Sequence, residues 1–131
     1  MSNPQEVSGA TSVEQQWKGL GITLSSEGTV AIVTYDQLDS PVNVLSSAVG
    51  AAFSSVFELI ERNTSYSGAV LMSGKKDTWI AGADIEELAG IRTPLQGEEL
   101  SRAGHVVMNQ LERMSKPVIA AIHGAALGGG L

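Results

Sequence analysis

The sequence predicts an α/β domain built around a parallel sheet. Two apolar runs, at 68–73 and 118–122, are continuous rather than alternating, as in strands that are covered on both faces. Segments with apolar residues at helical spacing separate these runs. Because strands that alternate with helices are joined by right-handed crossovers, neighbouring strands should run parallel. The expected order is two strands, a helix, a strand, a short helix, a longer helix, a strand and a glycine loop.

The composition restricts the class of protein. A chain of 131 residues with 43% hydrophobic and 17% charged residues suits one folded domain rather than a disordered segment. The net charge of −6 argues against a nucleic-acid partner, and no apolar run approaches the roughly 18 residues that a membrane span needs. Cysteine is absent and no targeting signal is visible, so we expect a cytoplasmic protein without disulfides.

The first part of the chain predicts a tail followed by a hairpin. The polar segment 1–19 is expected to be a flexible tail, and the domain is expected to occupy 20–131. Within the domain, the β-rich segments 21–24 and 29–34 flank the turn residues 25–28, which indicates two antiparallel strands.

A long loop and a helix should follow the hairpin. Pro41 prevents regular structure in 36–43, and either Ser46 or Ser47 can cap the next helix. One face of that helix should be buried, because its apolar residues recur at helical spacing. These residues are Val49, Phe53, Val56, Phe57 and Ile60.

Two further helices have clear start signals. Asp84, with Glu87 three residues later, fits the pattern of a reciprocal cap, and this short helix should end at Gly90. Thr93 and Pro94 open a longer helix, which is expected to run to about Met114 before the buried strand at 118–122.

Two glycine-containing loops, 80–85 and 124–131, are the candidate site. Glycine loses more backbone entropy on folding than other residues, and the usual return is a close approach or exposed N–H groups. Both loops follow strands, so they should lie at the same end of the sheet, where ligands bind. We expect the N–H groups of Ala83 and Gly129 to hold one oxygen atom. The alternative is a pair of purely structural turns.

Helix starts would strengthen such a site. Ala83 directly precedes the expected cap Asp84, and Gly129 would have the same placement if a helix opens at 130–131. Each such donor is worth about 3–4 kcal/mol toward a developing oxyanion. Phosphate-binding motifs are a weaker explanation, because neither a Walker motif nor a Gly-x-Gly-x-x-Gly fingerprint is present.

The loops and their flanks resemble a known family. The segments 79–85, 116–124, 126–131 and 40–46 are similar to the enoyl-CoA hydratase (crotonase) family, in register and in order. Within it, the forms at 80–85 and 42–46 are most similar to the branch found at the amino-terminal part of fatty-acid oxidation complex α-subunits. The resemblance implies a crotonase-type fold with a ββα spiral core, of which 20–131 would be the first, C-terminally truncated part.

The resemblance also implies roles for individual residues. The matching positions for two N–H groups that bind the thioester oxygen of an acyl-CoA are Ala83 and Gly129. The segments at 81–85 and 42–44 would border coenzyme A. The implied binding residues are Val42, Val44, Ala81, Gly82, Asp84, Ile85 and Gly128.

The implied reaction is hydration of 2-trans-enoyl-CoA to 3-hydroxyacyl-CoA. No cofactor is implied for this chain, because the substrate itself carries coenzyme A, and NAD would be bound only by a downstream domain. An oligomer, with a thiolase β-subunit as partner, follows by analogy.

The chain departs from the family in one respect. The two glutamates of the hydration reaction would follow Leu131, so we expect a fragment that keeps the oxyanion hole but is inactive alone. The alternatives are a Δ3-Δ2-enoyl-CoA isomerase, another reaction through a CoA-thioester enolate, or a non-catalytic module that binds coenzyme A or serves assembly.

Other polar residues are expected to have structural roles. Glu86 and Glu87 are explained as charges at a helix start, His105 as a solvated side chain and His123 as a partner in a strand-end hydrogen bond. Two histidines without clustered carboxylates predict no metal site. Four cations could contact CoA phosphates or simply lie on the surface; they are Lys75, Lys76, Arg92 and Lys116.

Overall fold

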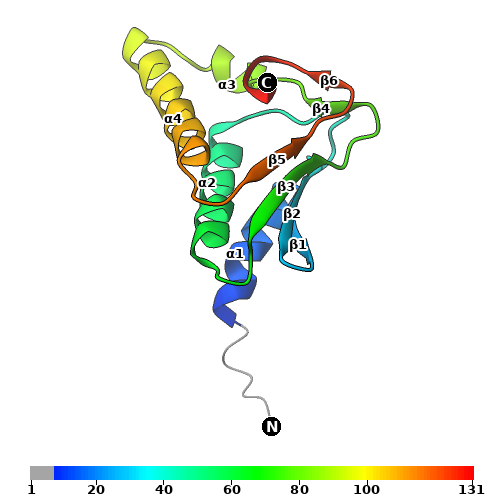
Figure 1. Ribbon diagram of the computed structural model, residues 1–131. Coiled ribbons are helices and arrows are strands. Elements are labelled where there is room, and N and C mark those ends of the chain that lie inside the picture. The colour runs from blue at the N-terminus through cyan, green and yellow to red at the C-terminus, as the bar shows by residue number, and fades with distance from the viewer. Residues whose placement is uncertain (1–7) are drawn as a thin grey trace.

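The computed structural model describes residues 8–131, and expectations for residues 1–7 lie outside the described residues (Figure 1). Helices and strands alternate along the chain, as predicted. In chain order the elements are α1 (Ser8–Gly19), β1 (Ile22–Glu27), β2 (Val30–Tyr35), α2 (Ser47–Arg62), β3 (Gly68–Ser73), β4 (Thr78–Ile80), α3 (Ile85–Ala89), α4 (Pro94–Glu112), β5 (Val118–Ala121), β6 (Ala125–Ala126) and the 3-10 turn η1 (Gly128–Gly130).

A four-stranded sheet in the order β1-β2-β3-β5 forms the centre of the fold. β1 and β2 form the expected antiparallel hairpin, with Ile22 opposite Tyr35. β3 runs parallel to both β2 and β5, so the predicted parallel neighbours are confirmed. A second, two-stranded parallel sheet pairs β4 with β6. These two strands were not predicted, because segments of two or three residues leave no periodicity to detect.

The core lies between the sheet and α2, and α4 packs against α2 (Figure 1). Each of the five apolar residues predicted on one face of α2 is buried. Full burial of such a side chain contributes about 1.5–3 kcal/mol to stability. α2 begins after Ser46, whose side chain accepts a hydrogen bond from Val49 N. The side chain of Asn43 is also completely buried in this region, although it is polar.

The amino-terminal tail was predicted incorrectly over residues 8–19. This segment is the helix α1, which contacts β1. The physical reason is Trp17, whose large side chain is only 3% exposed and joins the core. The prediction of a flexible tail rested on the polar composition of the segment and did not take this single aromatic residue into account.

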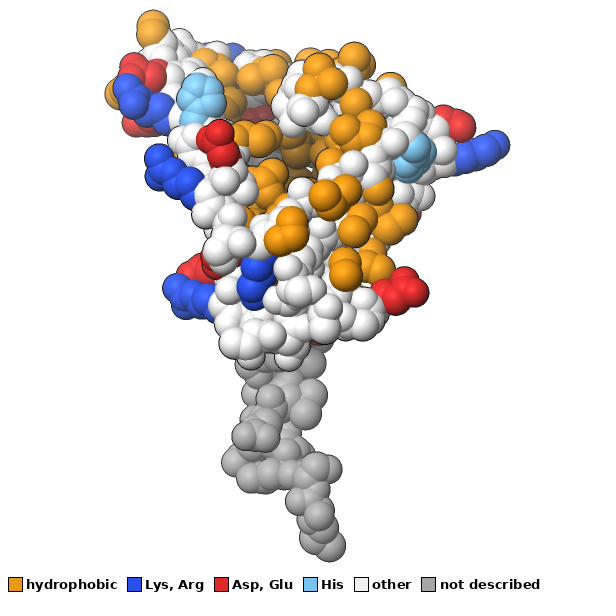
Figure 2. All heavy atoms as spheres, viewed as in Figure 1, with side chains coloured by type: hydrophobic (Ala, Val, Ile, Leu, Met, Phe, Trp, Pro, Cys, Tyr) orange, Lys and Arg blue, Asp and Glu red, His pale blue; other side chains and the backbone are white. Residues whose placement is uncertain are grey.

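β5 was predicted as a buried strand, and the structure contradicts this. Ile119 is 60% exposed, because β5 is the edge strand of the larger sheet and no described element covers its outer face. Figure 2, in the same view as Figure 1, shows hydrophobic side chains gathered on the surface along β5. α4 likewise has no fully buried residue, although Val107, Leu111 and Met114 pack partly against the core.

No helix among residues 8–131 is both long and apolar enough to cross a membrane.

Candidate active site

The two predicted loops are in contact. Leu127 N donates a hydrogen bond to Ile80 O at 3.0 Å, which joins the start of one loop to the end of β6. Gly82 and Gly128 lie close enough that a Cβ atom on Gly128 would be 3.5 Å from Gly82 Cα. Both glycines have positive φ, +112° and +54°, so these positions require the backbone freedom of glycine. The expectation that the loops face each other therefore has a geometric basis.

The candidate donors are the N–H groups of two exposed residues, Ala83 and Gly129, and neither has a hydrogen-bond partner among residues 8–131. Within residues 8–131, neither group donates to a backbone or side-chain acceptor. The neighbouring amides of Ala81, Asp84 and Gly130 are all hydrogen-bonded. Since Ala83 and Gly129 themselves are exposed, an external acceptor can reach their amides.

The direction of each donor follows from the peptide plane to which it belongs. Gly82 O accepts a hydrogen bond from Leu45 N at 2.8 Å, and Gly128 O accepts one from Leu131 N at 3.1 Å. In a trans peptide the C=O and N–H groups point in opposite directions. The N–H of Ala83 therefore points away from Leu45, and the N–H of Gly129 points away from Leu131.

Leu45 connects the two loops. Its N–H holds Gly82 O, and its carbonyl accepts a hydrogen bond from Asp84 N at 3.1 Å, so its backbone pairs with Ala83 as an isolated parallel bridge. A Cβ atom on Gly129 would lie 2.9 Å from Leu45 Cδ1, which places this side chain against the second loop. Leu45, in the segment before α2, thus lies against both loops that carry the candidate donors.

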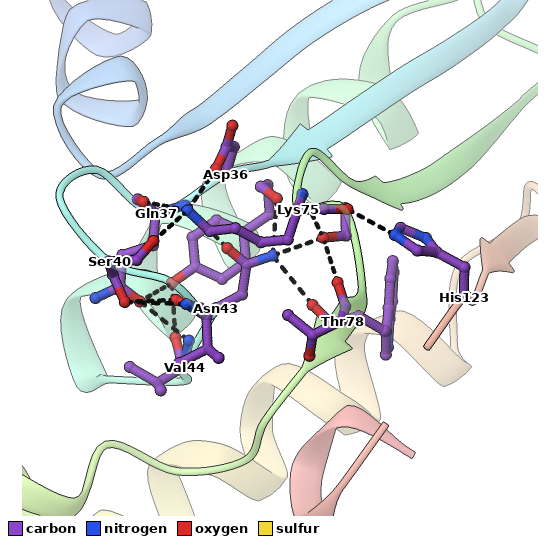
Figure 3. A network of polar contacts seen from close by, with 12 residues as sticks. Asp36, Gln37, Ser40, Asn43, Val44, Lys75, Thr78 and His123 are labelled. Carbon is purple, nitrogen blue, oxygen red and sulfur yellow. Dashed lines mark hydrogen bonds and ion pairs between the residues drawn. The ribbon is translucent and has the colours of Figure 1, made fainter. Parts of the chain in front are cut away.

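The segment 43–45 is fixed by side chains behind it (Figure 3). Tyr35 donates its hydroxyl hydrogen to Val44 O at 2.6 Å, and Val44 N donates to Gln37 Oε1 at 3.0 Å. Burial raises the pKa of Tyr35 to about 12, with the bond to Val44 acting in the opposite direction and the charge of Asp84 adding to the increase. Tyr35 therefore stays a neutral donor at neutral pH.

Asp84 and Glu87 cap two different helices. Asp84 accepts hydrogen bonds from Glu86 N and Glu87 N at the start of α3, as predicted. The reciprocal half of the predicted cap does not form, since the Glu87 carboxylate instead accepts from Ser47 N, at 3.0 Å for Oε2, at the start of α2. Tertiary contact with α2 thus replaces the local bond. Gly129 lies in the short 3-10 turn η1 rather than at the start of an α-helix.

Lys75 and His123 have structural roles. Lys75 Nζ donates to the carbonyls of Gln37 and Ser40 and pairs with Asp36 at 2.6 Å. His123 Nε2 lies 2.7 Å from Lys75 O, which is the predicted strand-end hydrogen bond. These contacts hold the loop after β3 against the loop after β2 (Figure 3).

The other candidate cations differ in their surroundings. Lys116 Nζ donates to Ile60 O and Asn63 O at the end of α2, and Arg92 donates to Ala89 O and Ile91 O. Lys76 is exposed, and so is His105, as predicted for a solvated side chain.

A cavity of about 200 Å³ lies beside the first loop. Of the predicted CoA-binding residues, Val44 and Asp84 line it together, whereas Ile85 is 78% exposed on α3. Val42, Ala81, Gly82 and Gly128 lie outside this lining. The remaining walls are Gly19, Leu20, Gln37, Leu38, Ser46 and Val49. The α1 end of the cavity was missed, because that segment was read as a tail.

Sequence reasoning also missed the polar residues that hold the site from behind. Asn43, Tyr35 and Gln37 form this support through the hydrogen bonds around segment 43–45. One signal was available: Asn43 stands between Val42 and Val44 in a loop, and a polar residue among apolar neighbours is often a buried, hydrogen-bonded one.

Comparisons with known proteins agree on one family. Residues 26–131 match the enoyl-CoA hydratase/isomerase family. The fatty acid oxidation complex subunit alpha of Shewanella oneidensis is 45% identical over 114 residues, which are 87% of this chain and 16% of that protein. The corresponding subunit of Shewanella halifaxensis is 46% identical over the same length. The chain thus spans about one-sixth of the curated relatives it matches.

Solved structures match the architecture. An enoyl-CoA hydratase from Bacillus anthracis superimposes with a TM-score of 0.77 at 27% identity, covering 84% of this chain and 42% of that one. An enoyl-CoA hydratase/carnithine racemase from Magnetospirillum magneticum gives a TM-score of 0.77 at 30% identity, covering 84% and 41%.

Proposed function

The chain belongs to the enoyl-CoA hydratase/isomerase family and has a crotonase-type fold, and from this premise we propose that it holds the thioester oxygen in an enzyme that hydrates 2-trans-enoyl-CoA during fatty-acid β-oxidation. The observation that carries the proposal is that the N–H groups of two exposed residues, Ala83 and Gly129, have no partner among the described residues and lie on two loops in contact. Backbone donors of this kind are suited to an oxygen atom that gains negative charge.

The reaction explains why such donors matter. When water adds to the β-carbon of an enoyl thioester, electrons move onto the carbonyl oxygen and an enolate forms. Donors that are already in place stabilise this oxygen more strongly in the transition state than in the substrate, and only such differential binding speeds the reaction. The trans peptide geometry at Gly82–Ala83 and Gly128–Gly129 supplies donors whose carbonyl ends are already bonded.

Coenzyme A would lie along the first loop. In this proposal Val44 and Asp84 contact it in the cavity beside that loop, and the neighbouring backbone at Ala81 and Gly82 borders the pantetheine arm. Val42, Ile85 and Gly128 would complete the contacts at the edges. The substrate brings its own coenzyme A, and NAD would belong to another domain.

The whole activity is proposed for a longer parent protein. This chain spans 16% of its relative from Shewanella oneidensis and 42% of the Bacillus anthracis hydratase. The proton-transferring glutamates would lie in the rest of the parent, which would also provide contacts to a thiolase β-subunit in an oligomer. The relatives named above are bacterial, which supports a cytoplasmic location. Because the family also includes isomerases, a Δ3-Δ2-enoyl-CoA isomerase is the second candidate.

Removing one donor tests the proposal. Gly129→Pro in the parent protein deletes the N–H and should lower kcat for crotonyl-CoA hydration by about 100-fold or more. Gly129→Ala is the matched control, because it keeps the N–H and its Cβ meets only the flexible side-chain ends of Leu45 and Met108. Hydration would be measured by the loss of enoyl-thioester absorbance. Wild-type turnover by Gly129→Pro would rule out this donor, and conversion of a 3-enoyl-CoA alone would favour the isomerase.

A further inference from the structure

We infer that Asn43 is a positioning residue for the Ala83 amide, an inference that rests on the proposed function of that amide. Asn43 contacts neither candidate donor directly. It acts through the backbone segment 43–45, which holds the carbonyl end of the Gly82–Ala83 peptide.

The Asn43 side chain is hydrogen-bonded to residues of three strands. Its Nδ2 donates to Tyr35 O at 2.9 Å, to Ser73 Oγ at 2.9 Å and to Trp79 O at 3.0 Å. Tyr35 ends β2, Ser73 ends β3 and Trp79 lies in β4. Because one amide nitrogen serves all three acceptors, the position of residue 43 is fixed relative to both sheets.

The side-chain oxygen and the backbone carbonyl of Asn43 are also hydrogen-bonded. Its Oδ1 accepts from Gln37 N at 2.9 Å, and its backbone carbonyl accepts from Ala81 N at 2.8 Å. The side chain is 0% exposed, and the described residues contain no buried side-chain polar atom without a partner. A fully satisfied buried network of this kind favours a single arrangement of its members.

The network transmits this fixed position to the donor in two steps. Asn43 fixes its own backbone, and the chain reaches Leu45 two residues later, where the Leu45 N–H bonds Gly82 O. The peptide plane then sets the direction of the Ala83 N–H. A small displacement of residue 43 would therefore turn the donor relative to a bound thioester, and misplacement of this order lowers rates substantially.

A purely structural role predicts a different result. If Asn43 only stabilised the fold, its loss would lower the unfolding temperature without changing how strongly a bound thioester carbonyl is polarised. The positioning role predicts that polarisation and kcat fall much more than the affinity for coenzyme A, because most of the proposed coenzyme A contacts lie outside the segment 43–45.

The test uses the parent protein and butyryl-CoA labelled with 13C at the carbonyl, a saturated thioester that cannot be hydrated. Asn43→Ala should bind it with near wild-type affinity, show a smaller downfield shift of the bound carbonyl resonance, and lose about 10- to 100-fold in kcat for crotonyl-CoA. Gln110→Ala is the control, since it removes a side-chain amide with two hydrogen bonds to Ser54 on α2, although this amide is only half-buried. It should keep the wild-type shift and kcat.

Each outcome decides a question. An unchanged carbonyl shift and kcat in Asn43→Ala would overturn the positioning role while leaving the proposed function intact. A wild-type protein that does not shift the carbonyl resonance would overturn the proposed function and this inference together. Should Asn43→Ala not fold, Ser73→Ala removes one acceptor of Asn43 Nδ2 and should reduce the carbonyl shift in the same direction. Failure to do so would contradict the inference.

Discussion

The two peptide groups that carry the candidate donors are anchored differently. The Gly82–Ala83 peptide is bonded through its carbonyl to Leu45, a residue distant in sequence whose surroundings include Asn43, Tyr35 and Gln37. The Gly128–Gly129 peptide is bonded through its carbonyl to Leu131, within the same turn. The first donor is therefore positioned by the packed interior, whereas the second depends on the conformation of its own loop.

The second loop nevertheless has two long-range attachments. Trp79 Nε1 donates to Gly130 O at 2.8 Å in a buried position, and Leu127 N donates to Ile80 O. Gly124 makes the turn into this loop possible, because its φ is +66° and its Cα lies against the Asp77 backbone. We therefore expect the position of the Gly129 N–H to be more sensitive to substitutions in its own loop. The position of the Ala83 N–H should be more sensitive to substitutions in the core.

The largest effect is expected from Gly124→Ala. Its Cβ would lie 2.0 Å from Asp77 O, and the positive φ adds strain, so we expect a loss of about 3 kcal/mol or more in the free energy of unfolding. Gly28→Ala is the matched control, because Gly28 has a similar φ of +59° with nothing within 4 Å of the added Cβ. It should cost only about 1 kcal/mol. Equal losses in urea unfolding would show that the contact with Asp77 is unimportant.

An intermediate effect is expected from Trp79→Phe. Phenylalanine keeps an aromatic ring but leaves Gly130 O without its donor, which should cost about 1–3 kcal/mol. The second loop should then be held less firmly, so kcat of the parent protein should fall while affinity for coenzyme A is retained. Trp17→Phe, which shortens an equally buried indole on α1, should lower stability without this fall in kcat. An unchanged kcat in Trp79→Phe would show that the indole does not support the second donor.

The smallest effect is expected from Tyr35→Phe. The ring keeps its edge contact with Phe53, and the hydrogen bonds of the hydroxyl group to Val44 O and Gln37 Oε1 are lost, at about 1–2 kcal/mol. Asn43 and Gln37 still hold the segment, so kcat should change little.

This substitution also has a pH signature. The pKa of Tyr35 is raised from its unfolded value of 10.0 to about 12, so the folded state keeps this proton longer than the unfolded state does. The associated stability is complete below pH 10 and is lost as the pH rises toward 12. Between pH 10 and pH 12, the free energy of unfolding of Tyr35→Phe, measured by urea unfolding, should therefore fall less than that of the wild type. Identical alkaline profiles would show that Tyr35 is not the titrating group.

Local sequence rules predicted much of the fold. The Ser46 and Asp84 caps, the helix start at Thr93 and Pro94 and the buried face of α2 all formed as expected, because they depend on spacing within one segment. Failures occurred where tertiary contacts decide the outcome. The Glu87 carboxylate binds Ser47 N of α2 instead of capping its own helix, and burial of Trp17 stabilises a helix in a polar segment.

The site was predictable only in part. Glycine content and strand ends identified the two loops, but their contact comes from the parallel pairing of β4 with β6, which was not predicted. The interior support could not be derived in this way, since Asn43 joins residues from three strands whose approach is a property of the folded chain. The exposure of Ile119 was unpredictable for a related reason, because apolar composition alone does not reveal which strand forms a sheet edge.

The bond between Gly82 O and Leu45 N has a consequence for a bound substrate. The carbonyl and the N–H of one peptide group share a conjugated electron system, so a hydrogen bond at one end strengthens a hydrogen bond at the other. An anion that forms in front of Ala83 would thereby tighten the contact behind it. If the proposed function holds, part of the negative charge would be carried by the Leu45 amide in the protein interior, and the strength of its hydrogen bond to Gly82 O would change during the reaction.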